Sequence, residues 1–397
     1  MSHFPTIPGF CFNGISAGIK KDKQNDFGLI FSETPAVAAG VFTTNWVKAA
    51  PLLITRQHLQ AKRCQAVVVN SGNANACTGK RGMDDAGRLA DETARRLGIA
   101  PELVAVASTG VIGEPLPIKK MLTTLPSLCT GKGKDDIENF AASIMTTDTF
   151  PKITARSVKI GGRKITVAGV AKGAGMINPS MATMLVFIVT DAAIRWQTLQ
   201  AWLNEGVNKT FNRITVDGDT STNDMVLVLA NGRAGNTPLS SKSPGATKFK
   251  EMLFEVMDDL ARNIIHDGEG ATKLIEITVR KAKSKQEAEA IARSVAYSPL
   301  VKTSFYGEEV NWGRIIAAAG KTPHPISFEK IDLDINRISL VSKGIVQGLR
   351  HEKRAQNELT KKNITINLTL NQGNQEFSIL TTDLSSDYVK INAGYKS

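Results

Sequence analysis

Several residues suited to chemistry lie together near the middle of the chain. Lys172, Asn178, Ser180 and Thr183 fall in one polar, glycine-bearing stretch that runs directly into the apolar segment 184–189. Because this segment is short and rich in β-branched side chains, it predicts a buried strand. The pattern therefore places a threonine hydroxyl at the mouth of a core strand. Two interpretations remain open at this point: an ordinary loop that feeds a strand, and a nucleophile held at the end of that strand.

Thr183 would be able to act as its own general base if the peptide bond from Ala182 were cut. The free α-amine would have an ordinary pKa of about 7.7–8.0, which suits proton transfer near neutrality. A neighbouring Lys172 ammonium is expected to lower that pKa. A nucleophile and a base on one residue form the N-terminal threonine variant of hydroxyl catalysis. The cut itself can be intramolecular, with Thr183 Oγ attacking the Ala182 carbonyl carbon and water opening the resulting ester.

Other common types of site are poorly represented. No phosphate-binding G-x-x-x-x-G-K-[ST], no G-x-S-x-G and no H-E-x-x-H pattern occurs. The 4 cysteines include no C-x-x-C pair, so we expect reduced thiols and no zinc site. The segment 217–224 is rich in oxygen ligands but lacks the glycine and glutamate of a calcium loop. We interpret it either as a loop near a site or as a simple turn, and we expect no metal.

Composition describes a globular protein with a basic surface. The chain has 397 residues, of which 42% are hydrophobic and 22% charged, and no apolar run approaches the length of a membrane span. The first residues lack the continuous apolar region of a signal peptide, so we expect a cytoplasmic protein. The net charge of +12 comes from dispersed Lys and Arg, and aromatic residues make up only 6%. This pattern favours a solvated surface that attracts small anions over a nucleic-acid site.

The expected helices are defined by their apolar spacing and their ends. Ser284 and Glu287 form a capping box for a helix that runs to residue 295. Gly98 and Gly206 are expected to end two other helices. In all, the apolar spacing predicts helices at residues 84–97, 135–145, 196–203, 247–264 and 285–295.

The expected strands do not alternate regularly with these helices. Residues 104–107 read as a strand that leads into a small-residue turn at 108–113. Alternating apolar residues predict strands at 331–335 and 364–370, with a hairpin at 371–374 that returns through residues 377–379. The mixture without βαβ order favours an α+β fold with a separate C-terminal subdomain.

The segment 172–185 closely resembles the self-cleavage signature of the ornithine acetyltransferase (glutamate N-acetyltransferase) family of arginine biosynthesis. The likeness extends in order through further motifs over nearly the whole chain, at residues 40–45, 70–79, 108–113, 145–149, 217–224, 267–273 and 311–314. Three positions depart from the family pattern. Glu309 and Val310 stand where the family usually has Asp-Pro, and Gly394 stands where an acidic residue is common.

The resemblance implies a particular fold and processing. It implies a layered sandwich of mixed β-sheets and helices, of the self-processing aminopeptidase and ornithine acetyltransferase type, with a smaller C-terminal α+β subdomain. The precursor would cut itself between Ala182 and Thr183 into an α chain, residues 1–182, and a β chain, residues 183–397. Within the β chain, residues 183–279 would complete the core and residues 280–397 would form the subdomain. The chains would stay together, usually as an α2β2 assembly.

The resemblance also implies a reaction and a set of site residues. Thr183 would take the acetyl group of N-acetylornithine and pass it to glutamate in a ping-pong sequence, with no cofactor. Thr109 and Gly110 match the pair that stabilises the oxyanion. A buried carboxylate at Glu269 would face the ammonium of the substrate. The positions that match substrate contacts are Thr147, Lys172, Thr183, Glu269, Asn392 and Ser397.

Three alternatives stay open from the sequence alone. Acetyl-CoA as a second acetyl donor would make the enzyme bifunctional, and no CoA motif decides the question. An N-terminal-nucleophile amidase or aminopeptidase on a related fold would use water in place of glutamate. A basic anion-binding or nucleic-acid-binding protein would leave Thr183 inert.

Overall fold

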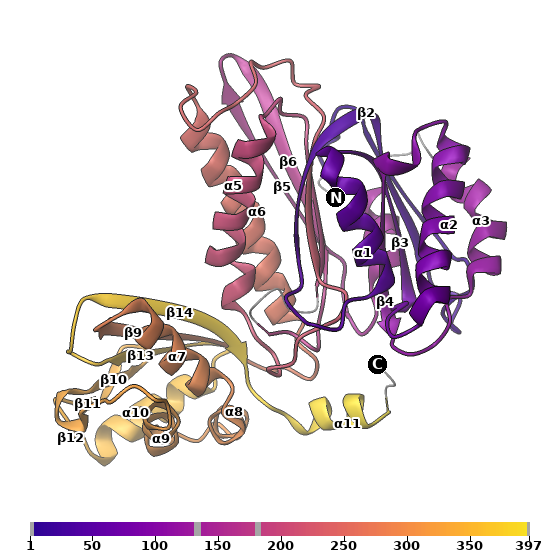
Figure 1. The fold of residues 1–397 in the computed structure, drawn as a ribbon. Coiled ribbons are helices and arrows are strands. Elements are labelled where there is room, and N and C mark those ends of the chain that lie inside the picture. The colour runs from indigo at the N-terminus through magenta and orange to yellow at the C-terminus, as the bar shows by residue number, and fades with distance from the viewer. Residues whose placement is uncertain (1–3, 131–135, 179–183, 395–397) are drawn as a thin grey trace. The chain divides into compact units, whose positions relative to one another are not determined.

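The computed structural model describes residues 4–130, 136–178 and 184–394, and these residues divide into two compact units (Figure 1). The first unit consists of the described residues up to Asn212 together with Asp219–Ile264. The second consists of Arg213–Gly218 and the described residues from Ile265 onward. The predicted cut at 182/183 and the chain boundaries that depend on it stay predictions, since residues 179–183 lie outside the described residues.

An eight-stranded mixed sheet forms the first unit. Its strand order is β4-β3-β2-β8-β7-β6-β5, and β1 pairs with β2. The β3–β4 and β7–β8 pairs are parallel, whereas the other pairs are antiparallel. The strands are β1 Phe10–Ile15, β2 Phe27–Phe42, β3 Arg63–Asn73, β4 Val104–Val111, β5 Lys152–Ile160, β6 Arg163–Lys172, β7 Leu185–Thr190 and β8 Met225–Ala230. Every residue of β7 and β8 is buried, which confirms the core strand predicted at 184–189.

Helices cover both faces of this sheet. Alternate residues of β3 separate the faces, with Val68 packing in one apolar cluster and Val67 in the other. The first cluster includes Leu89 of the second helix, and the other includes Phe140 of the fourth. The helices are α1 Ala50–His58, α2 Gly79–Leu97, α3 Ile118–Thr130, α4 Ile137–Ile144, α5 Trp196–Lys209 and α6 Ala246–His266. Gly98 ends α2 with φ 70°, as expected for a glycine after a helix.

The expectation that Gly206 ends a helix is wrong. α5 continues through this glycine to Lys209. A Cβ at position 206 would lie 2.6 Å from the sulfur of Met257 on α6, so the missing side chain permits close approach of two helices. The sequence signal of a helix stop and that of a helix crossing are the same residue type, and only the packing distinguishes them.

A six-stranded sheet forms the second unit, in the order β12-β11-β10-β13-β9-β14. Its strands are β9 Leu274–Ala282, β10 Asp332–Ile335, β11 Ile338–Ser342, β12 Ile345–Val346, β13 Asn363–Thr369 and β14 Gln375–Thr382. Its helices are α7 Lys285–Ala296, α8 Pro299–Tyr306, α9 Trp312–Gly320, α10 Leu349–Leu359 and α11 Ser386–Gly394. The predicted serine cap is confirmed, because Ser284 Oγ accepts from the Glu287 amide at 3.1 Å, but the Glu287 carboxylate accepts from the Lys283 amide and not from that of Ser284.

The hairpin predicted at 371–374 is wrong. β13 and β14 are consecutive in the chain, but β9 lies between them, parallel to β13 and antiparallel to β14. The connecting turn wraps around the end of β9, where the Gln372 and Gly373 amides both donate to the Lys281 carbonyl. Strand alternation predicts that a strand exists but does not say which strand becomes its neighbour.

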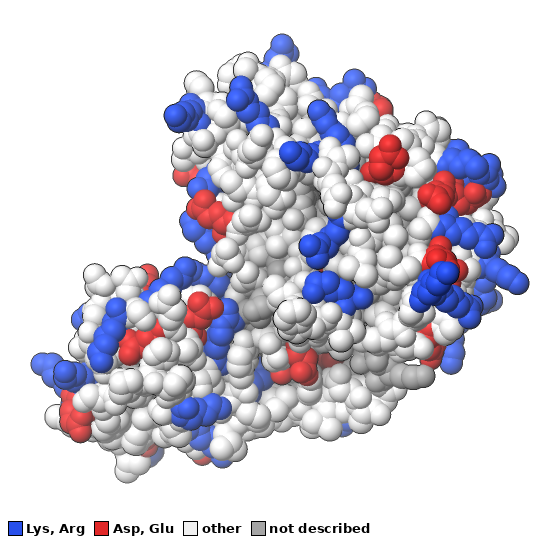
Figure 2. All heavy atoms as spheres, in the orientation of Figure 1, with Lys and Arg blue, Asp and Glu red and all other residues white. Residues whose placement is uncertain are grey.

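The two mixed sheets with their helices confirm the predicted α+β class. None of the helices in the described part of the chain combines the length and apolar character that a bilayer span requires. On the face drawn in Figure 2, Lys and Arg side chains are spread among Asp and Glu and do not gather in one patch. The described cysteines are free thiols, as expected.

Candidate active site

The polar residues of the first unit meet where several strands end. Thr109 and Gly110 are near the end of β4, which extends through Val111, so the turn expected from residue 108 begins only after that strand. Gly110 has φ 131°, and a Cβ there would lie 2.4 Å from the backbone carbonyl carbon of Gly72. Only glycine fits, because the neighbouring strand occupies the space of a side chain. Thr109 itself is 5% exposed.

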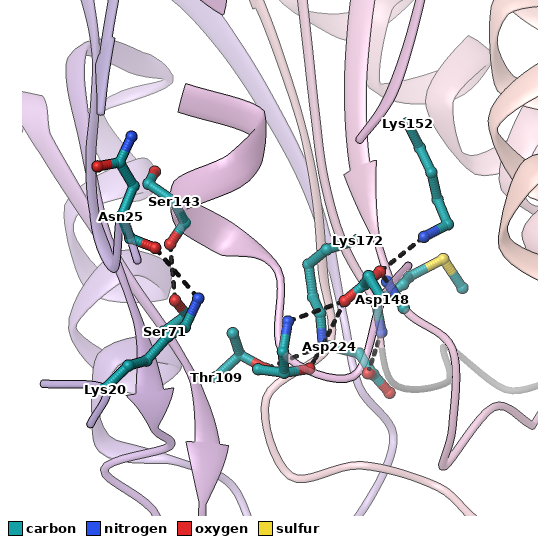
Figure 3. A network of polar contacts seen from close by, with 12 residues as sticks. Lys20, Asn25, Ser71, Thr109, Ser143, Asp148, Lys152, Lys172 and Asp224 are labelled. Atoms are coloured by element: carbon teal, nitrogen blue, oxygen red, sulfur yellow. Dashed lines mark hydrogen bonds and ion pairs between the residues drawn. The ribbon is translucent and has the colours of Figure 1, made fainter. Parts of the chain in front are cut away.

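Lys172 reaches Thr109 from the end of β6. Its side chain is almost fully buried, and its Nζ donates to Thr109 Oγ1 at 3.3 Å and to Thr146 Oγ1 at 2.8 Å (Figure 3). A hydroxyl that accepts from an ammonium keeps its own proton for another acceptor. The Thr109 hydroxyl is therefore prepared to donate to an oxygen that gains negative charge.

A buried carboxylate supports this lysine. Asp148 Oδ2 lies 4.0 Å from Lys172 Nζ, and Asp148 Oδ1 lies 2.7 Å from the buried Lys152 Nζ (Figure 3). The Gly173 amide donates to Asp148 at 2.7 Å and the Thr146 amide at 2.9 Å. Burial alone would raise the pKa of Asp148, but the two lysine charges and these hydrogen bonds outweigh it and hold the pKa at about 2. The side chains of Lys152 and Lys172 thus both contact this one carboxylate.

The segment 217–224 serves the site as structural support. Asn223 Nδ2 donates to the Ser108 carbonyl at 2.8 Å and to the Ala74 carbonyl at 2.7 Å, which ties β4 to the neighbouring loop. Asp224 Oδ1 accepts from the Met184 amide at 2.8 Å. These contacts place the segment against β4 and the start of β7, and its role beside a site stays a prediction. In the described ranges, no group of three or more His, Cys, Asp or Glu side chains gathers as metal ligands would.

The other predicted site residues fall in three places. Thr147 follows Thr146 in the α4–β5 loop and is partly buried. Glu269 and Asn392 are together in the second unit, where Asn392 Nδ2 donates to Glu269 Oε2 at 2.8 Å. The expectation of a buried carboxylate at Glu269 is wrong, because its side chain is only half-buried and its amide partner is exposed. The calls at Ala182, Thr183 and Ser397 lie outside the described residues.

Sequence reasoning did not single out four of the supporting residues: Thr146, Asp148, Lys152 and Asp224. Three of them fall inside the matched motifs 145–149 and 217–224, so the motifs themselves were the signal. The fourth, Lys152, lies at the start of β5 and becomes visible only through its contact with Asp148.

The nearest strand pairing connects this cluster with the predicted nucleophile. Lys172 pairs with Leu185 across β6 and β7, so Thr183 is joined by two peptide bonds to a residue that lies opposite Lys172. A hydroxyl donor, a buried ammonium and a strand that begins two residues after a threonine suit chemistry on an acyl group. The fold and site are therefore those expected of an enzyme that moves acyl groups.

Comparison with known proteins gives the family. The chain belongs to the ArgJ family, whose family model matches residues 11–397. It is 48% identical over 391 residues to the arginine biosynthesis bifunctional protein ArgJ of Geobacter sulfurreducens. The matched residues make up 98% of this chain and 100% of the relative. It is 49% identical over 389 residues to the arginine biosynthesis bifunctional protein ArgJ of Staphylococcus epidermidis. Here the matched residues make up 98% of this chain and 96% of the relative.

A solved structure agrees with this assignment. The crystal structure of the ArgJ protein from Bacillus halodurans matches with a TM-score of 0.50 and 44% identity, covering 53% of this chain and 98% of the solved chain. The α+β architecture and the family resemblance inferred from the motifs are both confirmed.

Proposed function

We propose that this protein is a self-processing cytoplasmic acetyltransferase of arginine biosynthesis. It cuts its chain between Ala182 and Thr183, takes the acetyl group of N-acetylornithine on Thr183, and passes that group to glutamate. The observation that carries the proposal is the contact of Lys172 with Thr109, at the end of β6 opposite the strand that Thr183 precedes. The name of the relatives, an arginine biosynthesis protein, supports the pathway.

The cut proceeds as an N-to-O acyl shift. Thr183 Oγ adds to the Ala182 carbonyl carbon, the carbon–nitrogen bond breaks, and the hydroxyl proton moves to the nitrogen that leaves. Water then adds to the ester and breaks its carbon–oxygen bond. Ala182 gains a carboxyl group, Thr183 Oγ regains its proton, and Thr183 has a free α-amine.

The transfer uses the same hydroxyl twice. The α-amine takes the proton of Thr183 Oγ as the oxygen attacks the acetyl carbon of N-acetylornithine, and it then delivers that proton to the ornithine nitrogen as the carbon–nitrogen bond breaks. Glutamate attacks the acetyl ester with its amine, and Thr183 Oγ leaves with a proton. The Thr109 hydroxyl and the Gly110 backbone stabilise the oxyanion in both halves, a contact typically worth about 3 kcal/mol.

The family resemblance implies substrate-contacting positions in each unit. They are Thr147 and Lys172 in the first unit and Glu269 and Asn392 in the second, and Ser397 lies outside the described residues. The hydrogen bond between Glu269 and Asn392 supports their joint role, since a carboxylate beside an amide suits an amino-acid ammonium. The two chains remain associated and pair as α2β2.

A second donor is part of the proposal. The relatives are named bifunctional, which favours acetyl-CoA as an additional source of the acetyl group. Donor profiling of the cleaved protein with N-acetylornithine and acetyl-CoA side by side separates the two activities. Transfer to glutamate from both donors supports the bifunctional assignment, and transfer from N-acetylornithine alone restricts the protein to one.

The decisive test combines a denaturing gel with an acceptor assay. Purified protein should run as two fragments, one ending at Ala182 and one beginning at Thr183, and Thr183→Ala should remain one inactive chain. N-acetylornithine consumption should require glutamate, whereas an amidase would consume it with water alone. An intact wild-type band, or activity in the Thr183→Ala variant, would refute the proposed function.

A further inference from the structure

The loop that carries Glu269 packs closely on α11, the helix that carries Asn392. Gly270 follows Glu269 with φ 65°, and a Cβ there would lie only 2.3 Å from the backbone nitrogen of Tyr388, in the first turn of α11. Only glycine fits at this position, because backbone occupies the place of a side chain. The loop and the helix are therefore in direct contact beside a predicted substrate residue.

Ser385 joins this loop to the helix with one hydroxyl. It is buried and directly precedes α11, its Oγ accepts from the Tyr388 amide at 3.2 Å, and the same Oγ donates to the Gly270 carbonyl at 2.6 Å. The first contact is that of a serine that caps a helix by binding the amide three residues on. A helix cap does not need the second contact, which connects the helix with the loop of Glu269.

A second anchor fixes the end of the loop. The Asp383 carboxylate is buried and accepts from the Thr272 amide at 2.9 Å, from the Thr272 hydroxyl at 2.5 Å and from the Lys273 amide at 3.0 Å. Together with the Ser385 contact, these hydrogen bonds hold the loop at its middle and at its end. The segment that precedes α11 thus sets the conformation of the loop.

The two predicted substrate residues meet across this contact. Asn392 Nδ2 donates to Glu269 Oε2 at 2.8 Å and to the Tyr388 carbonyl at 3.1 Å. Both amide hydrogens of Asn392 are used in this way, so the oxygens of the pair are the groups that can bind a ligand. Acceptor oxygens that include those of a carboxylate suit an ammonium group.

We propose that Ser385 is a positioning residue that holds Glu269 against Asn392 and thereby determines how strongly this pair prefers an acetyl donor with a side-chain ammonium. The inference rests on the proposed function, in which N-acetylornithine carries that ammonium. Without the Ser385 hydroxyl, the Gly270 carbonyl loses its hydrogen bond, and the loop is released from the helix at the residue next to Glu269. The carboxylate then has more positions available, and its contact with the ammonium weakens.

The experiment measures the preference for an ammonium and not activity alone. The probes are N-acetylornithine and N-acetylnorleucine, whose side chains have equal length and differ in that a methyl group replaces the ammonium. The ratio of their kcat/KM values, with glutamate as the acceptor, reports the contact with the ammonium. Calorimetric titration with ornithine and with norleucine measures the same preference at equilibrium.

Ser298→Ala is the control for Ser385→Ala. Ser298 is also buried, and its Oγ accepts from the amide three residues on, at the start of α8 in the same unit. Removal of either hydroxyl therefore takes away a helix cap. Only Ser385→Ala also removes a hydrogen bond to the loop of Glu269.

Gly344→Ala is the control for Gly270→Ala. Gly344 has φ 72°, and a Cβ there would lie 2.6 Å from the backbone of Glu329. Each variant forces backbone apart in the second unit, but only Gly270→Ala does so between the loop and α11. This second pair of variants keeps the proposal testable if Ser385→Ala does not fold.

Ser385→Ala should lower the preference for the ammonium by about three- to tenfold, the change expected from loss of one hydrogen bond of ordinary strength. Gly270→Ala should lower it at least as far. Ser298→Ala and Gly344→Ala should keep the wild-type ratio even where they reduce the yield of folded protein, because a loss of active molecules affects both probes equally.

An unchanged ratio in folded Ser385→Ala protein would overturn the inference, and so would a ratio that falls equally in Ser298→Ala. If Ser385→Ala does not fold, the comparison of Gly270→Ala with Gly344→Ala decides in the same way. Wild-type protein that transfers acetyl from N-acetylornithine without preferring it over N-acetylnorleucine also refutes the inference. Wild-type protein that transfers no acetyl group from N-acetylornithine to glutamate refutes the proposed function instead.

Discussion

Lys172 is held in place by a buried polar network. Its ammonium lies against Thr109, while Asp148 compensates its charge from behind and is itself held by Lys152. Burial by itself disfavours the charged form of a lysine. The shared carboxylate allows two buried ammonium groups to coexist, and one of them is directed at the strand end where the oxyanion is proposed to form.

Asp148→Asn should destabilise the protein and flatten its pH dependence. The variant removes the buried carboxylate that both lysines contact, and breaking a buried pair typically costs about 3–5 kcal/mol. Because the native pKa of Asp148 is about 2, below its value in the unfolded chain, its contribution is complete above pH 4 or so and is lost as the pH falls through 2. Urea unfolding should therefore show a gap between wild type and variant that narrows by about 2 kcal/mol over this range.

The control for this measurement is Asp258→Asn. Asp258 pairs with Arg262 at 2.7 Å, but both side chains are 45% exposed. Exposed pairs contribute about 1 kcal/mol or less. The control should stay close to wild type at every pH, and an Asp148→Asn protein that did the same would contradict the proposed role of the buried cluster.

The sequence motifs predicted where the cluster around Lys172 lies, but they did not predict which of its side chains contact one another. Thr109 and Lys172 were predicted as site residues, and the structure brings them together. Asp148 and Asp224 lie in matched segments, yet no spacing rule distinguishes a buried carboxylate that orients a lysine from a solvated one. That difference depends on burial and on partners far along the chain, which a linear pattern does not contain.

At the scale of elements, two glycines in helices show opposite uses of the same residue. Gly206 in α5 faces Met257 of α6, and a Cβ there would lie 2.6 Å from the sulfur. Gly87 lies inside α2, and a Cβ there would meet no atom within 4 Å. The first glycine permits helix packing, whereas the second only weakens its helix.

Gly206→Ala and Gly87→Ala should therefore change stability in opposite directions. The added methyl group at 206 forces Met257 aside in a filled core and should cost about 1–3 kcal/mol. The same change at 87 should stabilise by about 0.5–1 kcal/mol, since alanine favours helix and finds open space. Thermal unfolding of the two variants measures both effects, and stabilisation by Gly206→Ala would show that the α5–α6 contact is loose.

The helices that local patterns predicted are present, but α1, α3, α8, α9, α10 and α11 were not predicted, and the patterns also failed where neighbouring strands had to be chosen. The helix at 285–295 has its serine cap, and the buried strand after residue 183 is present. The turn at 371–374 joins two strands as predicted, but β9 lies between them. Strand order depends on pairing between distant parts of the chain. Nothing in the sequence around residues 371–374 indicates that β9, which comes much earlier in the chain, lies between the two strands.

At the scale of the whole molecule, the predicted cut separates strands that are interleaved in one sheet. In the sheet order β4-β3-β2-β8-β7-β6-β5, β8 and β7 lie side by side, and both come after residue 182 in the chain. Their neighbours in the sheet, β2 and β6, both come before residue 182 in the chain. The β chain therefore shares one backbone ladder with β2 and another with β6. Neither chain can leave without breaking both.

The cleaved chains should consequently remain together under native conditions. Size-exclusion chromatography of fully cut protein should yield one peak that contains both fragments, and concentrated urea should separate them. Asp258→Asn protein, which keeps its strands, should behave identically. Release of either fragment from a native column would contradict the interleaved sheet.

The position of β7 and β8 inside the sheet also sets an order of events during biosynthesis. In the proposed function the cut uses groups from β4 and β6, and these meet only when the inserted strands have docked. We therefore expect a chain to be cut only after its eight-stranded sheet has formed. In pulse-labelled cells, the ratio of cut to intact polypeptide should therefore measure the folding yield of any variant that retains Thr183.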